Sequence, residues 1–271
     1  MGTALPVVVG TDGSPESLDA VAWAAVEADV RRRPLRIVHA FVWPTVYAPF
    51  AAPVPPPYES GIQEAATEIL DEAAERARSA APGAQVETEI RIEQPGAALI
   101  AASESASLVV VGHRGRGGFT GMLLGSVGVA LAAHATCPTV VVRRGGEGGT
   151  ATGRIVVGVD GSPQGELALE FAFDHASAYS AGLTALHVYD RPTENHSLAE
   201  VVGRWTEKYP DVNARYHGVL GRPAEALVDH SQGALLLVVG SRGRGGFTGM
   251  LLGSVSQAAI RHATCPVAVV K

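Results

Sequence analysis

Short runs of β-branched apolar residues alternate along the chain with longer segments in which apolar residues recur at helical spacing. The run PVVVGT at 6–11 is typical of a strand that is buried on both faces. In the segment after it, apolar residues from Leu18 to Val26 fall on one side of a helix, and Ser14 and Pro15 suit its N-cap and first position. The first half thus predicts strands at 6–11, 35–42, 86–94, 107–112 and 138–143, with helices over 12–32, 59–81, 96–106 and 126–135.

The second half repeats this order, so we expect one structural unit to be used twice. Fourteen residues, RGRGGFTGMLLGSV, occur at 114–127 and again at 242–255. Strands alternating with helices imply right-handed crossovers and a parallel sheet. We therefore predict an α/β protein of two tandem doubly wound, Rossmann-like domains, each a five-stranded parallel sheet with helices on both faces. Its parts are a first domain at 1–143, a Gly-rich linker at 144–153, a second domain at 154–271, and second-domain strands near 154–159, 183–189, 213–219, 235–240 and 266–270.

The two units differ most in the segment that follows the second strand. Residues 43–60 hold six prolines, whereas the second unit has only the shorter segment 189–197. Proline removes a backbone donor and favours extended or turn conformations, so we expect 43–60 to form a loop or flap. Because only the first unit has this insert, we expect ligands to reach the two units unequally.

Charge and composition narrow the classes of function. The chain has 271 residues and a net charge of −6, which does not suit a nucleic-acid partner, because such a surface needs a basic patch. No stretch reaches the ~18 apolar residues of a membrane span, and no secretory pattern opens the sequence, so we expect a cytoplasmic protein without a membrane partner. The two cysteines, Cys137 and Cys265, are expected to be reduced, buried thiols.

Each copy of the repeated loop joins a predicted strand to a predicted helix, which is where α/β proteins hold phosphates. Glycines let a phosphate approach the backbone and permit positive φ, and Ser126 and Ser254 stand where helices begin. The alternative is that the glycines only make a mobile connection. The loop lacks Gly-Lys-Ser/Thr, so it is not a P-loop.

Asp12 and Asp160 follow the first strand of each unit. Each carboxylate suits a ribose hydroxyl, a base or a metal-bound water, or else a cap on the following helix. The histidines His39 and His187 are expected to pack, because no nucleophile or acid partner accompanies them. We predict no catalytic residues and no metal ligands within the chain.

These features together resemble the universal stress proteins, over nearly the full length and twice. The resemblance rests on VVVGTDGS and IVVGVDGS and on the two G-x2-G-x9-G-S loops. It implies one ATP site per domain, with Mg²⁺ as a possible companion of the nucleotide, and pairing through the last strands, as in a homodimer. The backbones of Ala40 and Val188 would meet adenine, and Asp12 and Asp160 would lie beside the adenosine. The residues implied at the two sites are Gly10, Thr11, Asp12, Ser14, Ala40, Gly112, Arg114, Gly115, Gly125, Ser126 and Val127, and Gly158, Val159, Asp160, Ser162, Val188, Gly240, Arg242, Gly243, Gly253, Ser254 and Val255.

Three functions remain open at this point. The first is an ATP-binding regulatory protein of the stress response with little or no hydrolysis, acting on a signalling partner that the sequence does not name. The second is a slow ATP hydrolase or a nucleotidyl or phosphoryl transferase on the same fold. The third is a scaffold that uses the fold only for pairing, with vacant sites.

Overall fold

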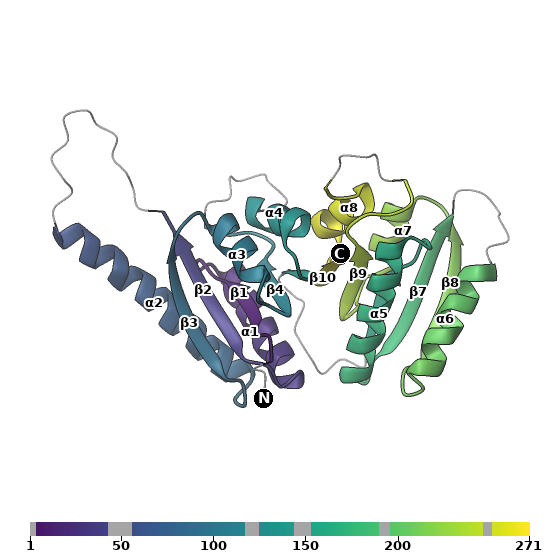
Figure 1. Cartoon of the computed structure of the whole chain (residues 1–271), viewed down its shortest axis with the longest axis horizontal. Helices are drawn as coiled ribbons and strands as arrows, with labels where there is room; N and C mark the ends of the chain where they lie inside the picture. The colour runs from purple at the N-terminus through teal and green to yellow at the C-terminus, as the bar shows by residue number, and fades with distance from the viewer. Residues whose placement is uncertain (1–3, 43–55, 117–124, 144–152, 190–195, 246–250) are drawn as a thin grey trace.

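Alternating strands and helices build one continuous sheet in the computed structural model of the chain (Figure 1). The structure describes residues 4–42, 56–116, 125–143, 153–189, 196–245 and 251–271. The first unit contains β1 (Val7–Gly10), α1 (Pro15–Val30), β2 (Leu35–Phe41), α2 (Pro56–Ala80), β3 (Val86–Ile92), α3 (Pro95–Ser103), β4 (Leu108–Gly112), α4 (Ser126–His134) and β5 (Thr139–Val142). The second contains β6 (Arg154–Gly158), α5 (Pro163–Ala178), β7 (Gly182–Tyr189), α6 (His196–Lys208), β8 (Ala214–Leu220), α7 (Pro223–His230), β9 (Leu236–Gly240), α8 (Ser254–His262) and β10 (Val267–Val270).

The ten strands lie in the order β3-β2-β1-β4-β5-β10-β9-β6-β7-β8. Within each unit all neighbours are parallel, and the order reverses beside β1 in the first unit and beside β6 in the second. This confirms the predicted doubly wound fold. The carboxyl ends of β1 and β4, and of β6 and β9, are thereby the edges where such sheets bind ligands.

The units join through their last strands. β5 and β10 pair antiparallel, with Val140 opposite Ala268. Figure 1 shows the units as the two arms of a V that meet at this junction. The expected pairing of last strands therefore occurs within one chain. A homodimer stays a prediction, and the β5 and β10 edges are not open to it.

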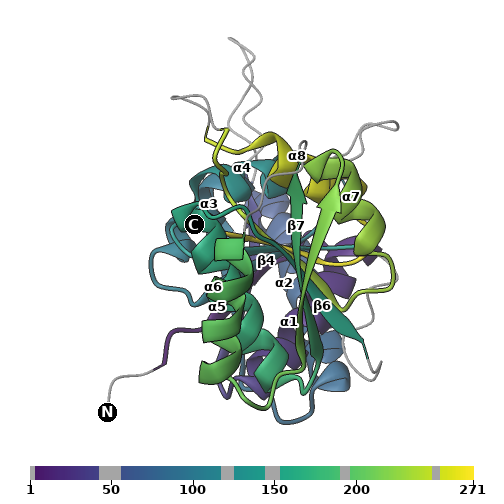
Figure 2. The same cartoon turned by 90° about the vertical axis from the view of Figure 1, so that its right-hand side faces the viewer.

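Two apolar layers cross the junction, one on each face of the sheet. One layer packs under α1, α2, α5 and α6, and the other under α3, α4, α7 and α8. Both views place α4 and α8 at the same end of the molecule (Figures 1 and 2). Because both layers continue from one unit into the other, the units bury a shared core as well as a shared sheet.

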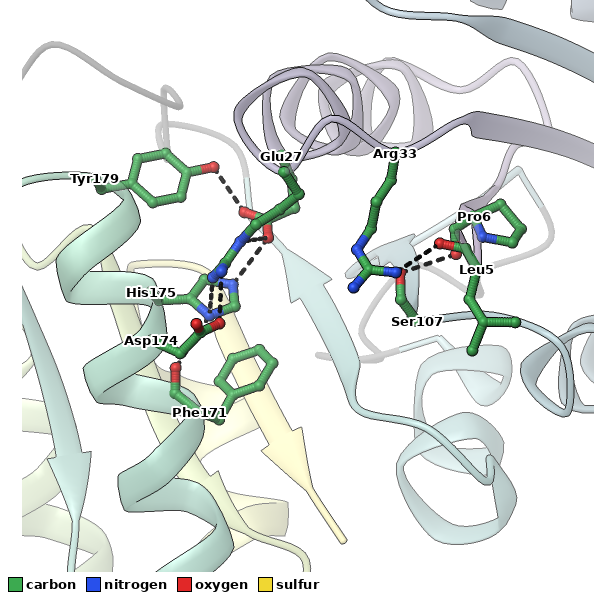
Figure 3. Close-up of polar contacts among 10 residues, drawn as sticks. Leu5, Pro6, Glu27, Arg33, Ser107, Phe171, Asp174, His175 and Tyr179 are labelled. Atoms are coloured by element: carbon green, nitrogen blue, oxygen red, sulfur yellow. Dashed lines mark hydrogen bonds and ion pairs between the residues drawn. The ribbon is translucent and has the colours of Figure 1, made fainter. Parts of the chain in front are cut away.

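A buried charge cluster connects α1 with α5 beside this junction (Figure 3). Glu27 Oε1 lies 3.0 Å from His175 Nε2, and Glu27 Oε2 accepts a 2.7 Å hydrogen bond from the hydroxyl of Tyr179. Arg31 lies 3.0 Å from Glu27 Oε1 and also pairs with Asp174. Although burial opposes ionisation, His175, Arg31 and Tyr179 together lower the pKa of Glu27 to about 2.

Two expectations about connecting segments need comment. The helix predicted from residue 59 begins at Pro56 as α2, which corrects the predicted extent of the proline-rich insert. Pro56 and Pro57 fit there because the first turn of a helix has no intrahelical acceptors for its N–H groups. The rest of the insert, 43–55, and the linker residues 144–152 lie outside the described residues. Among the described helices, none has the length and apolarity that a bilayer crossing requires.

Candidate nucleotide site

A cavity of about 470 Å³ opens at the carboxyl ends of β1 and β4, which is within the usual size range of small-molecule sites. Its apolar lining includes Val38, Leu99 and Val111. Its polar lining includes Asp12, at the end of β1, and loop residues around Gly115. Residues that line it are Gly10, Thr11, Asp12, Ser17, Val38, Ala40, Pro95, Leu99, Val111, Gly112, Arg114, Gly115, Gly125, Ser126, Val127 and Gly128.

Asp12 ties the strand end to the glycine-rich loop. One carboxylate oxygen accepts from the N–H and the hydroxyl of Ser14, at 3.0 and 2.6 Å, and the other accepts from the N–H of Arg116 at 2.6 Å. Burial alone would raise the pKa of Asp12, but these hydrogen bonds outweigh it and lower the pKa. Asp160 makes the same contacts with Ser162 and the N–H of Arg244.

Of the two alternatives for these aspartates, the helix cap belongs to another residue. Ser14 is the N-cap of α1, and its hydroxyl accepts from the N–H of Ser17. Ser162 does the same for α5. The aspartates therefore hold the loops in place, and Asp12 also lines the cavity, which leaves its contact with a bound ligand as a proposal.

The glycines of the loop serve close approach rather than positive φ. A Cβ at Gly115 would lie 2.3 Å from Asp12 Oδ2, and one at Gly112 would lie 2.6 Å from the backbone oxygen of Glu16. Among the described residues the positive-φ glycines near the sites are Gly13 and Gly161, which follow the aspartates. The expectation of positive φ within the described part of the loop is thus corrected.

Gly125 closes the loop and begins the helix that follows. Its N–H donates to the carbonyl of His113 at 2.8 Å, and a Cβ on it would meet its nearest atom only at 3.5 Å. As the N-cap of α4, Gly125 brings no side chain to the first turn. The amides of Ser126, Val127 and Gly128 thus lie at the rim of the cavity, where a helix N-terminus favours an anion.

The backbone of Ala40 points toward the cavity. Val38 accepts from the N–H of Thr11 at 2.9 Å, so the N–H and C=O of Val38 face β1. Because this direction alternates along a strand, those of Ala40 face the same way, beyond the end of β1. His39 Nδ1 donates to the carbonyl of Thr11 at 2.8 Å, which satisfies that oxygen. An adjacent donor and acceptor are therefore offered to a flat polar ligand.

The second unit repeats this geometry with different surroundings. The N–H of Val159 donates to the carbonyl of Leu186 at 3.0 Å, so Val188 stands where Ala40 does. Gly253 caps α8 and donates to Ser241, and a Cβ at Gly243 would lie 2.5 Å from Asp160. The predicted residues Gly158, Gly240, Arg242, Ser254 and Val255 occupy the corresponding strand ends, loop and helix start.

Sequence reasoning missed the apolar wall of the first cavity. Val38 could have been inferred, because it lies two residues before Ala40 and so on the same face of the strand. Leu99 lines the cavity from α3, and nothing in the sequence of α3 indicates that it does. Among the described residues, no three His, Cys, Asp or Glu side chains gather as a metal site would require. Cys137 and Cys265 are buried and unpaired, and burial raises the pKa of Cys137 to about 11. His39 and His187 are buried, as expected of packed side chains.

Comparisons with known proteins agree with this architecture. The model of the universal stress protein family matches residues 5–143 and 152–271. A universal stress protein of Mycolicibacterium smegmatis is 40% identical over 290 residues, which covers 98% of this chain and 96% of that one. One from Mycobacterium tuberculosis is 38% identical over 289 residues, with 99% and 97% covered. The crystal structure of a universal stress protein from Archaeoglobus fulgidus aligns with a TM-score of 0.76 at 25% identity, covering 98% of this chain and 96% of that one.

Proposed function

This chain belongs to the universal stress protein family as a tandem of two such domains, and on that premise we propose that each domain binds one ATP molecule. Binding would serve a regulatory role in the stress response, in the cytoplasm, with little or no hydrolysis. The observation that carries the proposal is that a backbone donor–acceptor pair at Ala40 and the first turn of α4 border the same cavity.

An adenine ring suits the inner part of the cavity. Val38, Leu99 and Val111 supply apolar contact for its faces, and the N–H and C=O of Ala40 match the acceptor and donor on its edge. Guanine presents a different order of donors and acceptors on that edge. We therefore expect adenine nucleotides to bind more tightly than guanine nucleotides.

A polyphosphate suits the opposite end. A helix N-terminus contributes about 0.3–2 kcal/mol to the free energy of binding an anion. Binding of the phosphates would therefore also need the loop amides and Arg114. Mg²⁺ would bind together with the nucleotide, coordinated by its phosphates. The ribose would lie between the two ends, near Asp12.

Slow turnover follows from how the nearest carboxylate is used. Both oxygens of Asp12 accept hydrogen bonds from Ser14 and from the N–H of Arg116, so abstraction of a proton from water would break contacts that hold the loop. An enzyme of ordinary activity would turn over at about 1 s⁻¹ or faster. Turnover at that rate, lost in a variant with Asp12→Ala and Asp160→Ala, would favour the hydrolase or transferase alternative.

Calorimetric titration of the nucleotide-free full chain with ATP tests the proposal. We expect saturation at two ATP per chain, with weaker binding of GTP as the specificity control. A chain that takes up no ATP would contradict the proposal and favour the scaffold alternative. Analysis of the small molecules released on denaturation gives a second, independent reading of the ligand.

A further inference from the structure

The last strand of each unit is followed by a basic residue that bonds to a helix of the other unit. Arg143, after β5, donates through Nη2 to the carbonyl of Ile260 at 2.8 Å and to that of Arg261, both in the last turn of α8. Lys271, after β10, donates through Nζ to the carbonyl of Ala135 at 2.5 Å and lies 3.4 Å from that of Leu131, at the end of α4. Arg143 and Lys271 occupy equivalent positions, and each contacts the C-terminal end of the equivalent helix in the other unit, although the carbonyls they reach differ.

The helices held in this way are those whose first turns form the candidate sites. α4 begins at Ser126 and α8 at Ser254, beside the two glycine-rich loops. Each has nine residues, and a helix so short depends on tertiary contacts for its position. A cation at the C-terminus satisfies unpaired carbonyls and complements the dipole whose positive end faces the site. Each unit therefore stabilises the far end of the other unit's site helix.

The same two residues also lie within electrostatic reach of their own unit's loop. Burial lowers the pKa of Arg143, and the charge of Arg114 lowers it further. Burial likewise lowers the pKa of Lys271, against the influence of Cys137, and Arg242 adds to the lowering. A bound phosphate would offset the charge of Arg114 or Arg242. Each of these cations therefore lies between the loop of its own unit and the helix of the other.

We propose that Lys271 and Arg143 are positioning residues that act across the junction, Lys271 for the nucleotide site of the first unit and Arg143 for that of the second. The inference rests on the proposed function. It gives one residue of each domain a role in holding the site helix of the other domain.

The test measures ATP affinity at one site at a time in the full chain. Gly253→Glu blocks the second site and leaves the first, whereas Gly125→Glu does the reverse. In the Gly253→Glu background we expect Lys271→Ala to weaken ATP binding roughly two- to fivefold, the ratio that corresponds to about 0.3–1 kcal/mol at a helix terminus. Lys271→Arg should retain the affinity because it keeps a cationic donor.

The matched measurement uses the Gly125→Glu background, where Lys271→Ala should have the smaller effect although Lys271 belongs to the second unit. The expected order reverses for Arg143→Ala, with Arg143→Lys as its conservative control. Equal losses at both sites, a loss confined to the variant's own unit, or no loss at either would overturn the inference. Melting temperatures of all variants separate lost affinity from unfolding.

Failure of the inference differs from failure of the proposed function. If neither single-site background binds ATP while Lys271 is intact, the proposed function is wrong. If both bind and Lys271→Ala does not favour loss at the first site, only the cross-unit role is wrong.

Discussion

The two units carry the same fourteen-residue loop, yet the residues behind it differ. Gly128 lines the first cavity, whereas its counterpart Ser256 is buried and donates to the carbonyl of Gly240 at 2.7 Å. In the first unit the hydroxyl of Thr11 lies 3.0 Å from that of Ser17, and the second unit has Val159 and Gly165 at these positions. The two identical loops are therefore surrounded by different side chains, which we call their supports. Sequence identity in a loop does not make two sites equal.

The ends of the second strands differ in the same way. His39 donates to the carbonyl of Thr11, but His187 Nδ1 lies 3.0 Å from the hydroxyl of Tyr216. Burial lowers the pKa of His187, and Arg244 lowers it further against the pull of Asp160. The second site thus has an aromatic hydroxyl beside its strand end, where the first has a backbone contact.

The largest expected effect concerns the buried contact between Glu27 and His175, which joins the two units and places a carboxylate and an imidazole at equivalent positions. Glu27 and His175 occupy the same place along α1 and α5, two helices of 16 residues that both begin with proline. Glu27→Gln leaves His175 and Arg31 buried without their carboxylate, which should cost about 3–5 kcal/mol of unfolding free energy. Denaturant unfolding measures it.

Two further variants make that result specific. Asp19→Ala, on the same helix but in an exposed pair with Arg76, should cost less than about 1 kcal/mol. Exchange of the pair, Glu27→His with His175→Glu, should recover part of the loss. A Glu27→Gln variant as stable as the native chain would show that the cluster does not hold the units together.

The second prediction is a pH dependence from the same carboxylate. Folding lowers the pKa of Glu27 from its ordinary 4.5 to about 2, so the folded state favours the charged form. The resulting stability, on the order of 3 kcal/mol, is fully present above about pH 5 and is lost as the pH falls toward 2. Stability of the native chain and of Glu27→Gln should therefore converge over this window. A difference that stays constant down to pH 2 would contradict the assigned cause.

The third prediction separates the two sites. Gly125→Glu and Gly253→Glu should each remove one ATP of two, with a loss of at least about 100-fold, or about 2.7 kcal/mol, at the altered site. Both glycines have room for a Cβ, since the nearest atoms would lie 3.5 and 3.4 Å away, so the variants should fold. Titration of each gives the affinity of the remaining site. Equal affinities would mean that the different supports and the insert do not affect binding.

The smallest expected effect comes from exchanging the residues that follow the first strand of each unit, Thr11 and Val159. Thr11→Val removes the hydroxyl that accepts from the N–H of Gly13 at 3.2 Å, at a cost of about 1 kcal/mol, and makes the position resemble Val159. Val159→Thr is the matched change in the other unit, where Gly165 brings no hydroxyl partner. Thermal unfolding and ATP titration should show that Thr11→Val loses stability and ATP affinity, whereas Val159→Thr gains neither. The opposite order would mean that the supports do not set the difference.

Local patterns in the sequence were enough for the strands and most helices, because alternation and glycine placement are local signals. The same holds for Asp12 and the loop, which strand ends bring together at a known edge, whereas Ala40 is expected only from the resemblance to a family. Contacts made across the junction had no such signal. Glu27 and His175 read as unrelated helix residues until antiparallel pairing of β5 and β10 brings α1 and α5 together, and Lys271 reads as a residue beyond the last strand.

That antiparallel pairing also has a consequence for the order of events during synthesis. β5 emerges from the ribosome long before β10, so the first unit must wait with an open sheet edge. During that wait the nearest complementary edge is that of another nascent first unit. Such a pair would place Glu27 against Glu27 and bury two like charges, whereas the correct partner brings His175. The contact between Glu27 and His175 stabilises the folded chain. The same arrangement would therefore also disfavour wrong pairing between nascent chains made on one mRNA.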